Sequence, residues 1–522
     1  MSTTIDRISP FTNEAIRSFA EPADATSLRA ALERARARLG THYPVVIDGK
    51  PIVTAESIAS RNPARPSEIV GNVGSASLDQ AMEAVEVASR AFETWKRAVT
   101  AERVGVLLRA SEKIRERRDD FNALLILEVG KTWVEADADT AEAIDFLEFY
   151  AREALRYAEP PPLVPLAGED NRLSYIGLGV GIVIPPWNFA FAIMAGMTAA
   201  AVVAGNTVVL KPSSDSPVIA AVFVDLLHEV GLPPGVVNFV PGSGRVIGDP
   251  LVAHPKTRFI AFTGSKEVGL RINELAAKTV PGQMWIKRVI AEMGGKDAIV
   301  VAADADLDAA ADGIVASAFG FAGQKCSACS RAIVESSVYE AIEARILERV
   351  GRLSVGDPAQ LATAVGPVIN ESALASMEAF IATALLEGGR LITGGFRIPG
   401  DGFVLAPTVI ADVGPQATIA QQEIFGPVLA LIRANDFDDA IAIANNTEFG
   451  LTGALYASDD VKLERARDEF HVGNLYLNRK CTGALVGVHP FGGFNMSGTD
   501  SKAGGYDYLA LFTQAKMVSK KR

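Results

Sequence analysis

The residues best suited to chemistry lie in the stretch Gly320–Ser330, which contains two of the three cysteines of the chain. Small glycine, alanine and serine residues surround Cys326, so little side-chain bulk stands between it and a substrate. Lys325 precedes it, and a nearby cation favours the thiolate, which is the nucleophilic form of cysteine. We therefore expect Cys326 to act as a covalent nucleophile.

Three other interpretations of this stretch are weaker. A single cysteine often packs as a small hydrophobic residue, which suits Cys329. The Cys326–Cys329 spacing is that of a redox dithiol, but the small domain with the motif opening a helix is missing. A zinc site needs two more ligands, and only Cys481 and five scattered histidines remain in the sequence. We expect no metal site.

Two further residues could act with the cysteine. Glu292 follows a predicted strand, Arg288–Ala291, and precedes Gly294-Gly295, where a side chain can enter a crevice; a surface carboxylate is the alternative. Asn188 follows Pro185-Pro186-Trp187, and these prolines force a turn after an apolar strand. Its amide could cap the next helix or donate hydrogen bonds to an oxyanion.

Three short segments could contact a cofactor. Thr263-Gly264-Ser265 separates the predicted strand Thr257–Phe262 from a helix, so helix N-terminal N–H groups could bind a phosphate there. Lys211-Pro212-Ser213 ends another strand and could contact a ribose. Gly242-Ser243-Gly244 is a second glycine-rich turn. None of these is a GxGxxG motif, and each alone could be an ordinary turn or strand end.

The elements that must position these residues alternate between short apolar strands and helices. In the middle of the chain, strands are predicted at Val180–Ile184, Thr207–Leu210, Val236–Val240 and Thr257–Phe262. The pattern restarts after Gly294-Gly295, with strands at Ala298–Val301, Ala332–Val334, Val428–Ile432 and Leu451–Tyr456. Helices are predicted between them, including Ala190–Val203 and Leu307–Phe321. This alternation predicts an α/β fold with doubly wound parallel sheets in two lobes.

The first part of the chain is predicted to be mostly helical. A helix near Leu28–Leu39 precedes a hairpin at His42–Val53, whose turn is Asp48-Gly49. A helical period then runs from Leu78 to Tyr157. Glu159-Pro160-Pro161-Pro162 ends it, before an extended segment that reaches Tyr175.

Composition limits the class of protein. A chain of 522 residues, 49% apolar and 21% charged, is typical of a soluble globular protein with two or three lobes. The net charge of −12 argues against nucleic acid or an anionic membrane as a partner. The sparse cysteines and the absence of an apolar leader lead us to expect a cytoplasmic location. The nearly uncharged segment Tyr175–Leu210 is interrupted by prolines and glycines, which favours a buried strand–helix–strand over a membrane span.

Several motifs together resemble the NAD(P)-dependent aldehyde dehydrogenase superfamily, over Glu56 to about Val518. In chain order they are Pro186-Trp187-Asn188-Phe189, Lys211-Pro212-Ser213, Phe262-Thr263-Gly264-Ser265, Glu292-Met293-Gly294-Gly295-Lys296, Gly323-Gln324-Lys325-Cys326, Glu423-Ile424-Phe425-Gly426-Pro427 and Pro490-Phe491-Gly492-Gly493. Within this superfamily the chain is most similar to the L-glutamate γ-semialdehyde dehydrogenases, through Glu142–Arg152, Gly168-Glu169-Asp170, Gln324–Ala328 and Phe470–Val488.

The resemblance implies a subunit of three parts. They are a Rossmann-type NAD(P)-binding domain formed by residues 1–158 and 176–290, an α/β catalytic domain at 291–490, and a small β flap formed by 159–175 and 505–522. In the family the flap strands bridge subunits, so a homo-oligomer, at least a dimer, is expected.

The resemblance also implies the reaction, the oxidation of L-glutamate γ-semialdehyde to L-glutamate in proline catabolism. Cys326 attacks the aldehyde, the Asn188 amide and the Cys326 N–H hold the oxyanion, and Glu292 activates water to hydrolyse the thioester. Succinate semialdehyde, another carboxylate-bearing aldehyde, is the alternative substrate. A CoA-acylating enzyme is disfavoured by Glu292, and a cofactor-binding protein without turnover is disfavoured by the presence of both Cys326 and Glu292.

The binding residues follow from the same resemblance. Lys211 and Glu423 would hold the two riboses of NAD, and Ser265 the pyrophosphate. The other predicted cofactor residues are Ile184, Pro185, Pro186, Trp187, Ser213, Ser214, Gly244, Phe262, Thr263, Gly264, Gly294 and Phe425. Many NAD-preferring relatives carry Glu at the position of Ser214, so NADP is expected to be accepted as well. Asn495 replaces a Lys of many relatives, with no consequence that we can assign.

The substrate pocket is assigned in the same way. The N–H groups of Gly483 and Ala484 and the Ser327 hydroxyl would bind the carboxylate, with Lys325 adding positive potential. Glu142 would face the ammonium group. Phe189 and Phe491 would line the aliphatic chain. Without the resemblance, Gly483-Ala484 would be interpreted as an ordinary tight loop.

Overall fold

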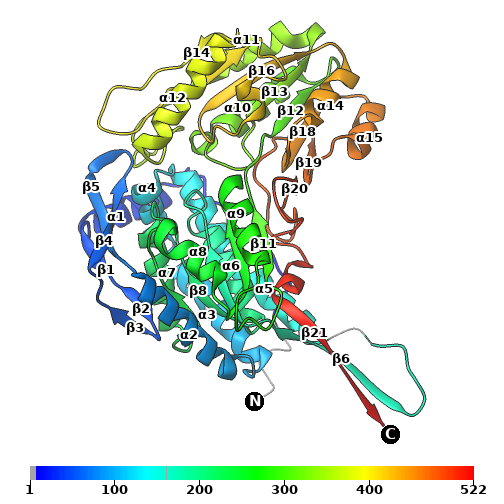
Figure 1. Ribbon diagram of the computed structural model, residues 1–522. Coiled ribbons are helices and arrows are strands. Elements are labelled where there is room, and N and C mark those ends of the chain that lie inside the picture. The colour runs from blue at the N-terminus through cyan, green and yellow to red at the C-terminus, as the bar shows by residue number, and fades with distance from the viewer. Residues whose placement is uncertain (1–7, 160–161) are drawn as a thin grey trace.

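A computed structural model of the chain describes residues 8–159 and 162–522 and shows two lobes with a projecting two-stranded ribbon (Figure 1). Each lobe is built on a seven-stranded sheet and has its own buried core. The parts of the sequence predictions that concern residues 1–7, Pro160 and Pro161 lie outside the described residues.

The sheet of the first lobe has the strand order β11-β10-β7-β8-β9-β2-β3. Its strands are β7 (Val180–Ile184), β8 (Thr207–Leu210), β9 (Val237–Phe239), β10 (Thr257–Thr263), β11 (Arg288–Glu292), β2 (Val45–Ile47) and β3 (Lys50–Ile52). The five from β11 to β9 run parallel, as predicted. The predicted hairpin is β2–β3, and positive φ angles at Asp48 (57°) and Gly49 (67°) allow its tight turn.

Helices cover both faces of this sheet. Successive strand residues point to opposite faces, so Ile182 joins a core beneath α2 and α9 whereas Val183 joins the core that contains α6 and α7. The helices are α2 (Leu78–Trp95), α3 (Thr100–Glu116), α4 (Arg118–Val129), α5 (Trp133–Ala158), α6 (Ala192–Val203), α7 (Pro217–Glu229), α8 (Asp249–Ala253) and α9 (Lys266–Ala277). The helical run predicted from Leu78 to Tyr157 is therefore four helices.

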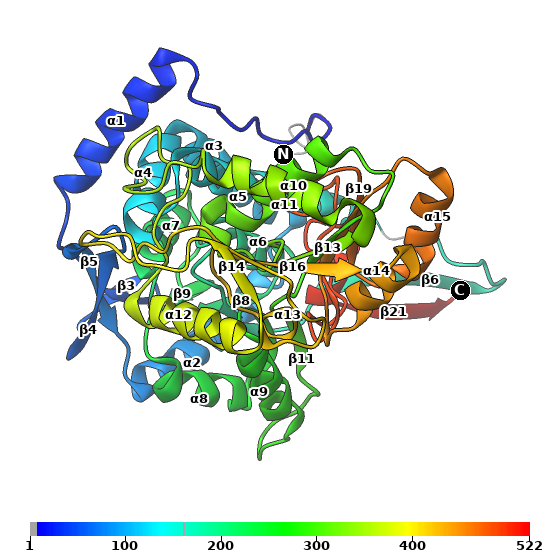
Figure 2. The ribbon, with the colours of Figure 1, turned by 90° about the horizontal axis from the view of Figure 1, so that it is seen from above.

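Two features of the N-terminal part differ from the predictions. Helix α1 (Pro22–Arg36) begins earlier than predicted, because Pro22 occupies its first turn, where proline is favoured. It lies at the periphery of the molecule against α4 (Figure 2). A three-stranded sheet of β1 (Thr41–Tyr43), β4 (Glu56–Asn62) and β5 (Arg65–Ser75) was not predicted in full, since the mostly exposed residues of β4 show little apolar alternation.

The second lobe has the strand order β14-β15-β16-β13-β12-β18-β19, parallel except for β14. The strands are β12 (Ala298–Val301), β13 (Arg331–Glu335), β14 (Arg390–Thr393), β15 (Thr408–Ala411), β16 (Val428–Ala434), β18 (Thr452–Tyr456) and β19 (Asn474–Leu477). Its main helices are α10 (Leu307–Phe319), α11 (Tyr339–Val350), α12 (Glu371–Leu386), α14 (Phe437–Asn445) and α15 (Asp460–Glu469). Helix α10 ends before the predicted Phe321, because Phe321 and Ala322 adopt positive φ angles.

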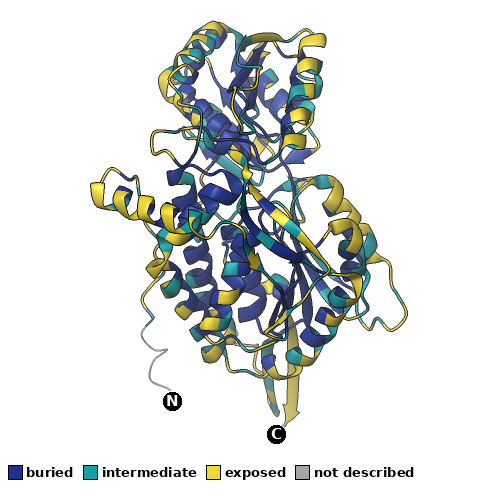
Figure 3. Cartoon of the chain, turned by 90° about the vertical axis from the view of Figure 1, so that its left-hand side faces the viewer, coloured by how far each residue is buried: buried dark blue, intermediate teal, exposed yellow. Residues whose placement is uncertain are grey.

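The ribbon pairs two segments that are far apart in the sequence. Strand β6 (Glu169–Gly177) runs antiparallel to β21 (Thr513–Lys521) over nine residue pairs, and the ribbon projects from the first lobe with most of its surface exposed (Figure 3). The short helical turn Tyr508–Phe512 before β21 packs into the core of the first lobe. In residues 8–159 and 162–522, no helix is long and apolar enough to cross a membrane, and the segment Tyr175–Leu210 contains β7, α6 and β8.

Candidate active site

The carboxyl ends of three neighbouring strands of the first lobe bring the predicted residues together. Ile184 at the end of β7 pairs with Phe262 of β10, and Thr263 of β10 pairs with Glu292 of β11. The turn that begins with Pro185 starts at this edge, and so does the turn that contains Gly264. Parallel strands end at one edge of a sheet, so residues separated by more than a hundred positions become neighbours there.

The turn that leads to Cys326 is tightly constrained. Phe321, Ala322 and Gly323 have φ angles of 51°, 53° and 67°. A Cβ on Gly323 would lie 2.2 Å from the carbonyl oxygen of Gly426, so only glycine fits there. Gln324 then anchors the turn: its Oε1 accepts from the backbone N–H of residue 369 at 2.8 Å, and its Nε2 donates to the carbonyl of residue 367 at 3.2 Å.

Asn188 reaches across to this turn. Its Nδ2 donates a hydrogen bond to the Gln324 carbonyl oxygen at 3.0 Å, and the residue is 4% exposed. The N-cap of α6 is Phe191, so Asn188 does not cap that helix. The oxyanion interpretation is therefore favoured over the helix-cap alternative, because the Asn188 amide lies beside the loop of Cys326 and keeps a second hydrogen to donate.

The surroundings of Cys326 oppose ionisation of its thiol. Burial raises the pKa of Cys326 well above its ordinary value, and the carboxyl groups of Asp297, Glu423 and Glu292 raise it further. The expectation that Lys325 favours the thiolate is wrong. Its Nζ instead donates to Glu135 Oε1 on α5 at 2.7 Å, so the cation on which that expectation relied is paired with another carboxylate.

Glu292 is held by two groups that the sequence argument did not assign. The Ser501 hydroxyl donates to its Oε1 at 2.6 Å, and the Gly493 N–H donates to its Oε2 at 3.3 Å. Burial raises the pKa of Glu292 to about 8, although both hydrogen bonds oppose that shift. Gly493 belongs to a motif that carried the resemblance, whereas no local pattern indicated Ser501.

Glu423 and Gly294, both predicted to bind the cofactor, are in contact. The Gly295 N–H donates to Glu423 Oε1 at 3.0 Å, and a Cβ on Gly294 would lie 2.1 Å from Glu423 Oε2. Burial raises the pKa of Glu423 to about 7. Phe425 has a φ of 58° and packs edge-on against Trp187, with ring centroids 5.6 Å apart.

The other predicted cofactor residues lie at strand ends or in turns. Lys211 is 7% exposed and donates to the Pro212 carbonyl at 3.2 Å, and burial lowers its pKa to about 8. Ser214 is exposed. The Ser265 hydroxyl accepts a hydrogen bond from the Val268 N–H and thus acts as an ordinary N-cap of α9. Gly244 begins the turn Gly244–Gly248 with open space where a side chain would lie.

The predicted substrate residues come from both lobes. Glu142 lies on α5, and burial raises its pKa to about 8, with Asp139 raising it further. Ser327 is buried. Its carbonyl accepts from Cys481 Sγ at 3.3 Å, which ties it to the loop of Gly483 and Ala484. Gly483 has a φ of 80°, as a tight loop requires, and Phe491 forms a β-bridge with residue 503.

The described residues form neither a cluster of metal-ligating side chains nor a disulfide at this site. Within the described ranges, no group of three His, Cys, Asp or Glu side chains could hold a metal ion. The three cysteines are free. Cys329 is 1% exposed and donates to the Arg331 carbonyl at 3.5 Å, which is the environment of a packing residue.

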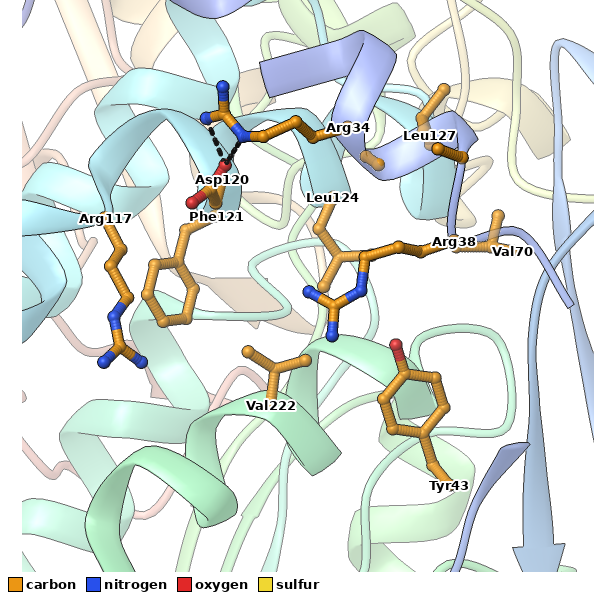
Figure 4. A pocket seen from close by; sticks show the side chains of 12 residues that line it. Arg34, Arg38, Tyr43, Val70, Arg117, Asp120, Phe121, Leu124, Leu127 and Val222 are labelled. Atoms are coloured by element: carbon orange, nitrogen blue, oxygen red, sulfur yellow. Dashed lines mark hydrogen bonds and ion pairs between the residues drawn. The ribbon is translucent and has the colours of Figure 1, made fainter. Parts of the chain in front are cut away.

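A cavity of about 510 Å³ lies elsewhere in the first lobe. Figure 4 shows Arg38 and Tyr43 pointing toward its centre and Arg34 bonded to Asp120 at its rim. None of the residues predicted for catalysis or binding lines it. The chemistry assigned above therefore belongs to the strand ends of the first lobe and the Cys326 turn, not to this cavity.

Comparisons with known proteins identify the family of the chain. The model of the aldehyde dehydrogenase family matches residues 52–518. A curated 1-pyrroline-5-carboxylate dehydrogenase from Geobacillus kaustophilus is 55% identical over 512 residues, which cover 98% of this chain and 99% of that one.

Solved structures show the same relationship. The crystal structure of 1-pyrroline-5-carboxylate dehydrogenase from Thermus with bound NAD superimposes with a TM-score of 0.97 at 50% identity, covering 99% of this chain and 100% of that chain. Betaine aldehyde dehydrogenase from Staphylococcus aureus, in complex with NAD+, is more distant, with a TM-score of 0.89, 28% identity and coverage of 95% and 97%. The chain thus belongs to the aldehyde dehydrogenase family.

Proposed function

We propose that this enzyme oxidises L-glutamate γ-semialdehyde to L-glutamate with NAD, as a step of proline catabolism. The observation that carries the proposal is the hydrogen bond from Asn188 to the Gln324 carbonyl, which brings an amide donor beside the Cys326 turn. Near-full-length relatives that are 55% identical and named for this activity support the choice of substrate.

The first half of the reaction uses Cys326 and Asn188. The Cys326 thiol gives its proton to water as its sulfur forms a bond to the aldehyde carbon, and the carbonyl oxygen becomes an oxyanion that accepts hydrogen bonds from the Asn188 amide and the Cys326 N–H. NAD held by Lys211 and Glu423 would supply the acceptor for the hydride that leaves this carbon. The carbon is thereby oxidised to a thioester on Cys326.

The second half uses Glu292. Its carboxylate takes a proton from a water molecule, which attacks the thioester carbon. The carbon–sulfur bond breaks, and L-glutamate leaves while the Cys326 sulfur is released. A base with a pKa of about 8 is half ionised near that pH, so Glu292 can both accept and return a proton.

The residues present fit a dinucleotide. Lys211 is buried, and among the described residues its Nζ donates to one carbonyl, so its ammonium has further hydrogens to offer to ribose hydroxyls. The Glu423 carboxylate packs against Gly294 and can accept from the second ribose. Open space at Gly244 and the N-terminus of α9 suit the phosphates. Because the exposed Ser214 carries no negative charge, NADP is also accepted.

The substrate assignment extends to the pocket residues. The N–H groups of Gly483 and Ala484 and the Ser327 hydroxyl bind the substrate carboxylate, Glu142 faces its ammonium group, and Phe189 and Phe491 line its chain. Lys325 contributes no direct contact, because it is paired with Glu135.

Assembly and domain roles belong to the same proposal. The cofactor domain is formed by residues 1–158 and 176–290, the catalytic domain by 291–490, and the flap of a cytoplasmic homo-oligomer by 159–175 and 505–522. The projecting ribbon β6–β21 supports this, because an isolated two-stranded sheet is only marginally stable in water.

One assay tests the proposal. Steady-state kcat/KM is measured for L-glutamate γ-semialdehyde and succinate semialdehyde, each with NAD and with NADP, and Cys326→Ala serves as the control for background reduction. The highest value is expected for L-glutamate γ-semialdehyde with NAD. Absence of NAD(P)H from that aldehyde overturns the proposal, and a higher kcat/KM for succinate semialdehyde transfers it to the alternative substrate.

A further inference from the structure

Lys131 is a fully buried lysine to which the reaction described above assigns no role. It lies in the short connection between α4 and α5, and its side chain is 0% exposed. Its Nζ is 3.2 Å from Asp139 Oδ2, whose side chain is also 0% exposed. Neither of these two atoms has another hydrogen-bond partner among the described residues. Burial of two charges is costly, and removal of one member of such a pair leaves an uncompensated buried charge.

The Lys131 ammonium lies between two aromatic rings that belong to the two catalytic turns. Its Nζ is 4.3 Å from the ring centroid of Phe189 and 4.5 Å from that of Phe321. Phe189 follows Asn188 in the chain, and Phe321 begins the left-handed turn that leads to Cys326. A desolvated cation attracts the faces of both rings, so one charge contacts both turns.

Asp139 connects the same pair to the backbone of the Asn188 turn. Its Oδ1 accepts a hydrogen bond from the Ala192 N–H at 2.7 Å, where α6 begins. The segment between β7 and α6 contains Asn188, so its far end is anchored by this carboxylate. A negative charge is favourable at a helix N-terminus, and Lys131 balances that charge inside the protein.

We propose that Lys131, together with Asp139, is a positioning residue that sets the Asn188 amide relative to Cys326. The pair acts through the Phe189 and Phe321 rings and through the first N–H of α6, and it touches neither substrate nor cofactor. This inference rests on the oxyanion role proposed for Asn188.

The test is a cycle of single-turnover measurements with NAD and L-glutamate γ-semialdehyde. Lys131→Met keeps an unbranched side chain and removes the charge. It is expected to slow NADH formation by about ten- to a hundred-fold, because a misplacement of about 1 Å can cost a hundred-fold in rate. In the Asn188→Ala background, the same change is expected to slow NADH formation by no more than about three-fold, since the positioned group is absent.

Controls separate positioning from general damage. Lys287→Met is the matched variant, because Lys287 is also buried and its Nζ donates to the Val252 carbonyl at 2.6 Å, away from both catalytic turns. It is expected to leave the single-turnover rate unchanged. If Lys131→Met does not fold, the double variant Lys131→Met/Asp139→Asn replaces it in the cycle. The double variant leaves no uncompensated charge, and the amide oxygen of the introduced Asn can still accept from the Ala192 N–H.

Two results overturn the inference. One is an equal slowing by Lys131→Met with and without Asn188, and the other is a slowing of less than about three-fold in the otherwise natural, folded enzyme. The activity of the unaltered enzyme and of Asn188→Ala alone reports on the proposed function. The slowing by Lys131→Met with Asn188 present, divided by its slowing in Asn188→Ala, reports on Lys131. Failure of the proposed function and failure of this inference are therefore distinguishable.

Discussion

The hydroxyl of Ser501 donates a hydrogen bond to Glu292 Oε1 at 2.6 Å, so a residue near the end of the chain holds the carboxyl group that we assign to water activation. Burial raises the pKa of Glu292 to about 8, whereas the Ser501 hydroxyl stabilises the ionised form and lowers it. Glu292 is therefore mostly protonated at pH 7, and its activity as a base is expected to increase as the pH rises through 8.

Ser501→Ala removes a donor to the ionised carboxylate and is expected to raise the pKa of Glu292 further. The rising limb of kcat against pH should then move to higher pH, and thioester hydrolysis at pH 7 should slow by about ten-fold or more, because a hydrogen bond to a charged group contributes about 1.5–3 kcal/mol. Thr499→Val is the matched control, because the Thr499 hydroxyl accepts from the Ala291 N–H and does not contact the carboxyl group. A pH profile that is unchanged in Ser501→Ala would remove Ser501 from the mechanism.

Cys326 and Cys329 are expected to respond differently to the same substitution. Cys326→Ala should abolish NADH formation, because the other two thiols, Cys329 and Cys481, are buried. Cys329→Ala should retain turnover within a few-fold and lower the free energy of unfolding by about 1 kcal/mol, since a small buried side chain is truncated. Loss of aldehyde oxidation in folded Cys329→Ala would instead indicate a dithiol mechanism. The measurements are steady-state kinetics and urea unfolding.

Cofactor choice is expected to depend on the charge at position 214. Ser214→Glu places a carboxylate near the proposed adenosine ribose, where it repels a 2′-phosphate. We expect kcat/KM for NADP to fall by about ten-fold or more, the effect of roughly 1.4 kcal/mol, with little change for NAD. Ser214→Gln, similar in size but neutral, is the control. Equal losses with both cofactors would show that the side chain only blocks the site.

The ribbon β6–β21 is expected to stabilise the oligomer. Met517 and Val518 are 50% and 48% exposed on β21, and apolar residues on a projecting two-stranded sheet are typical of an interface. Met517→Asp should convert the oligomer to a smaller species, measured by light scattering after size-exclusion chromatography. Lys516→Gln, a change at an exposed residue of the same strand, should not. An unaltered mass in Met517→Asp would assign the interface to another surface.

Much of the fold was predictable because its signals are local. Strands β7, β8 and β12 have the predicted bounds, since each is a short apolar run between turn residues. The Asp48-Gly49 turn was also predicted, because positive φ angles favour these residues. Helix α12 and strand β4 were not predicted. The helix carries exposed apolar residues such as Leu386 beside its buried ones, which weakens its amphipathic pattern, and the strand has mostly exposed residues.

The sequence by itself determined which residues are chemically competent and in what order they occur: Cys326 in a small-residue loop, Glu292 at a strand end and Asn188 in a proline turn. The tertiary structure alone decided what each of them contacts. Lys325 stands next to Cys326 in the chain, yet it pairs with Glu135, 190 residues away. The bond from Ser501 to Glu292 joins residues 209 positions apart. Local patterns report backbone conformation and burial, whereas such pairings depend on how the two lobes meet.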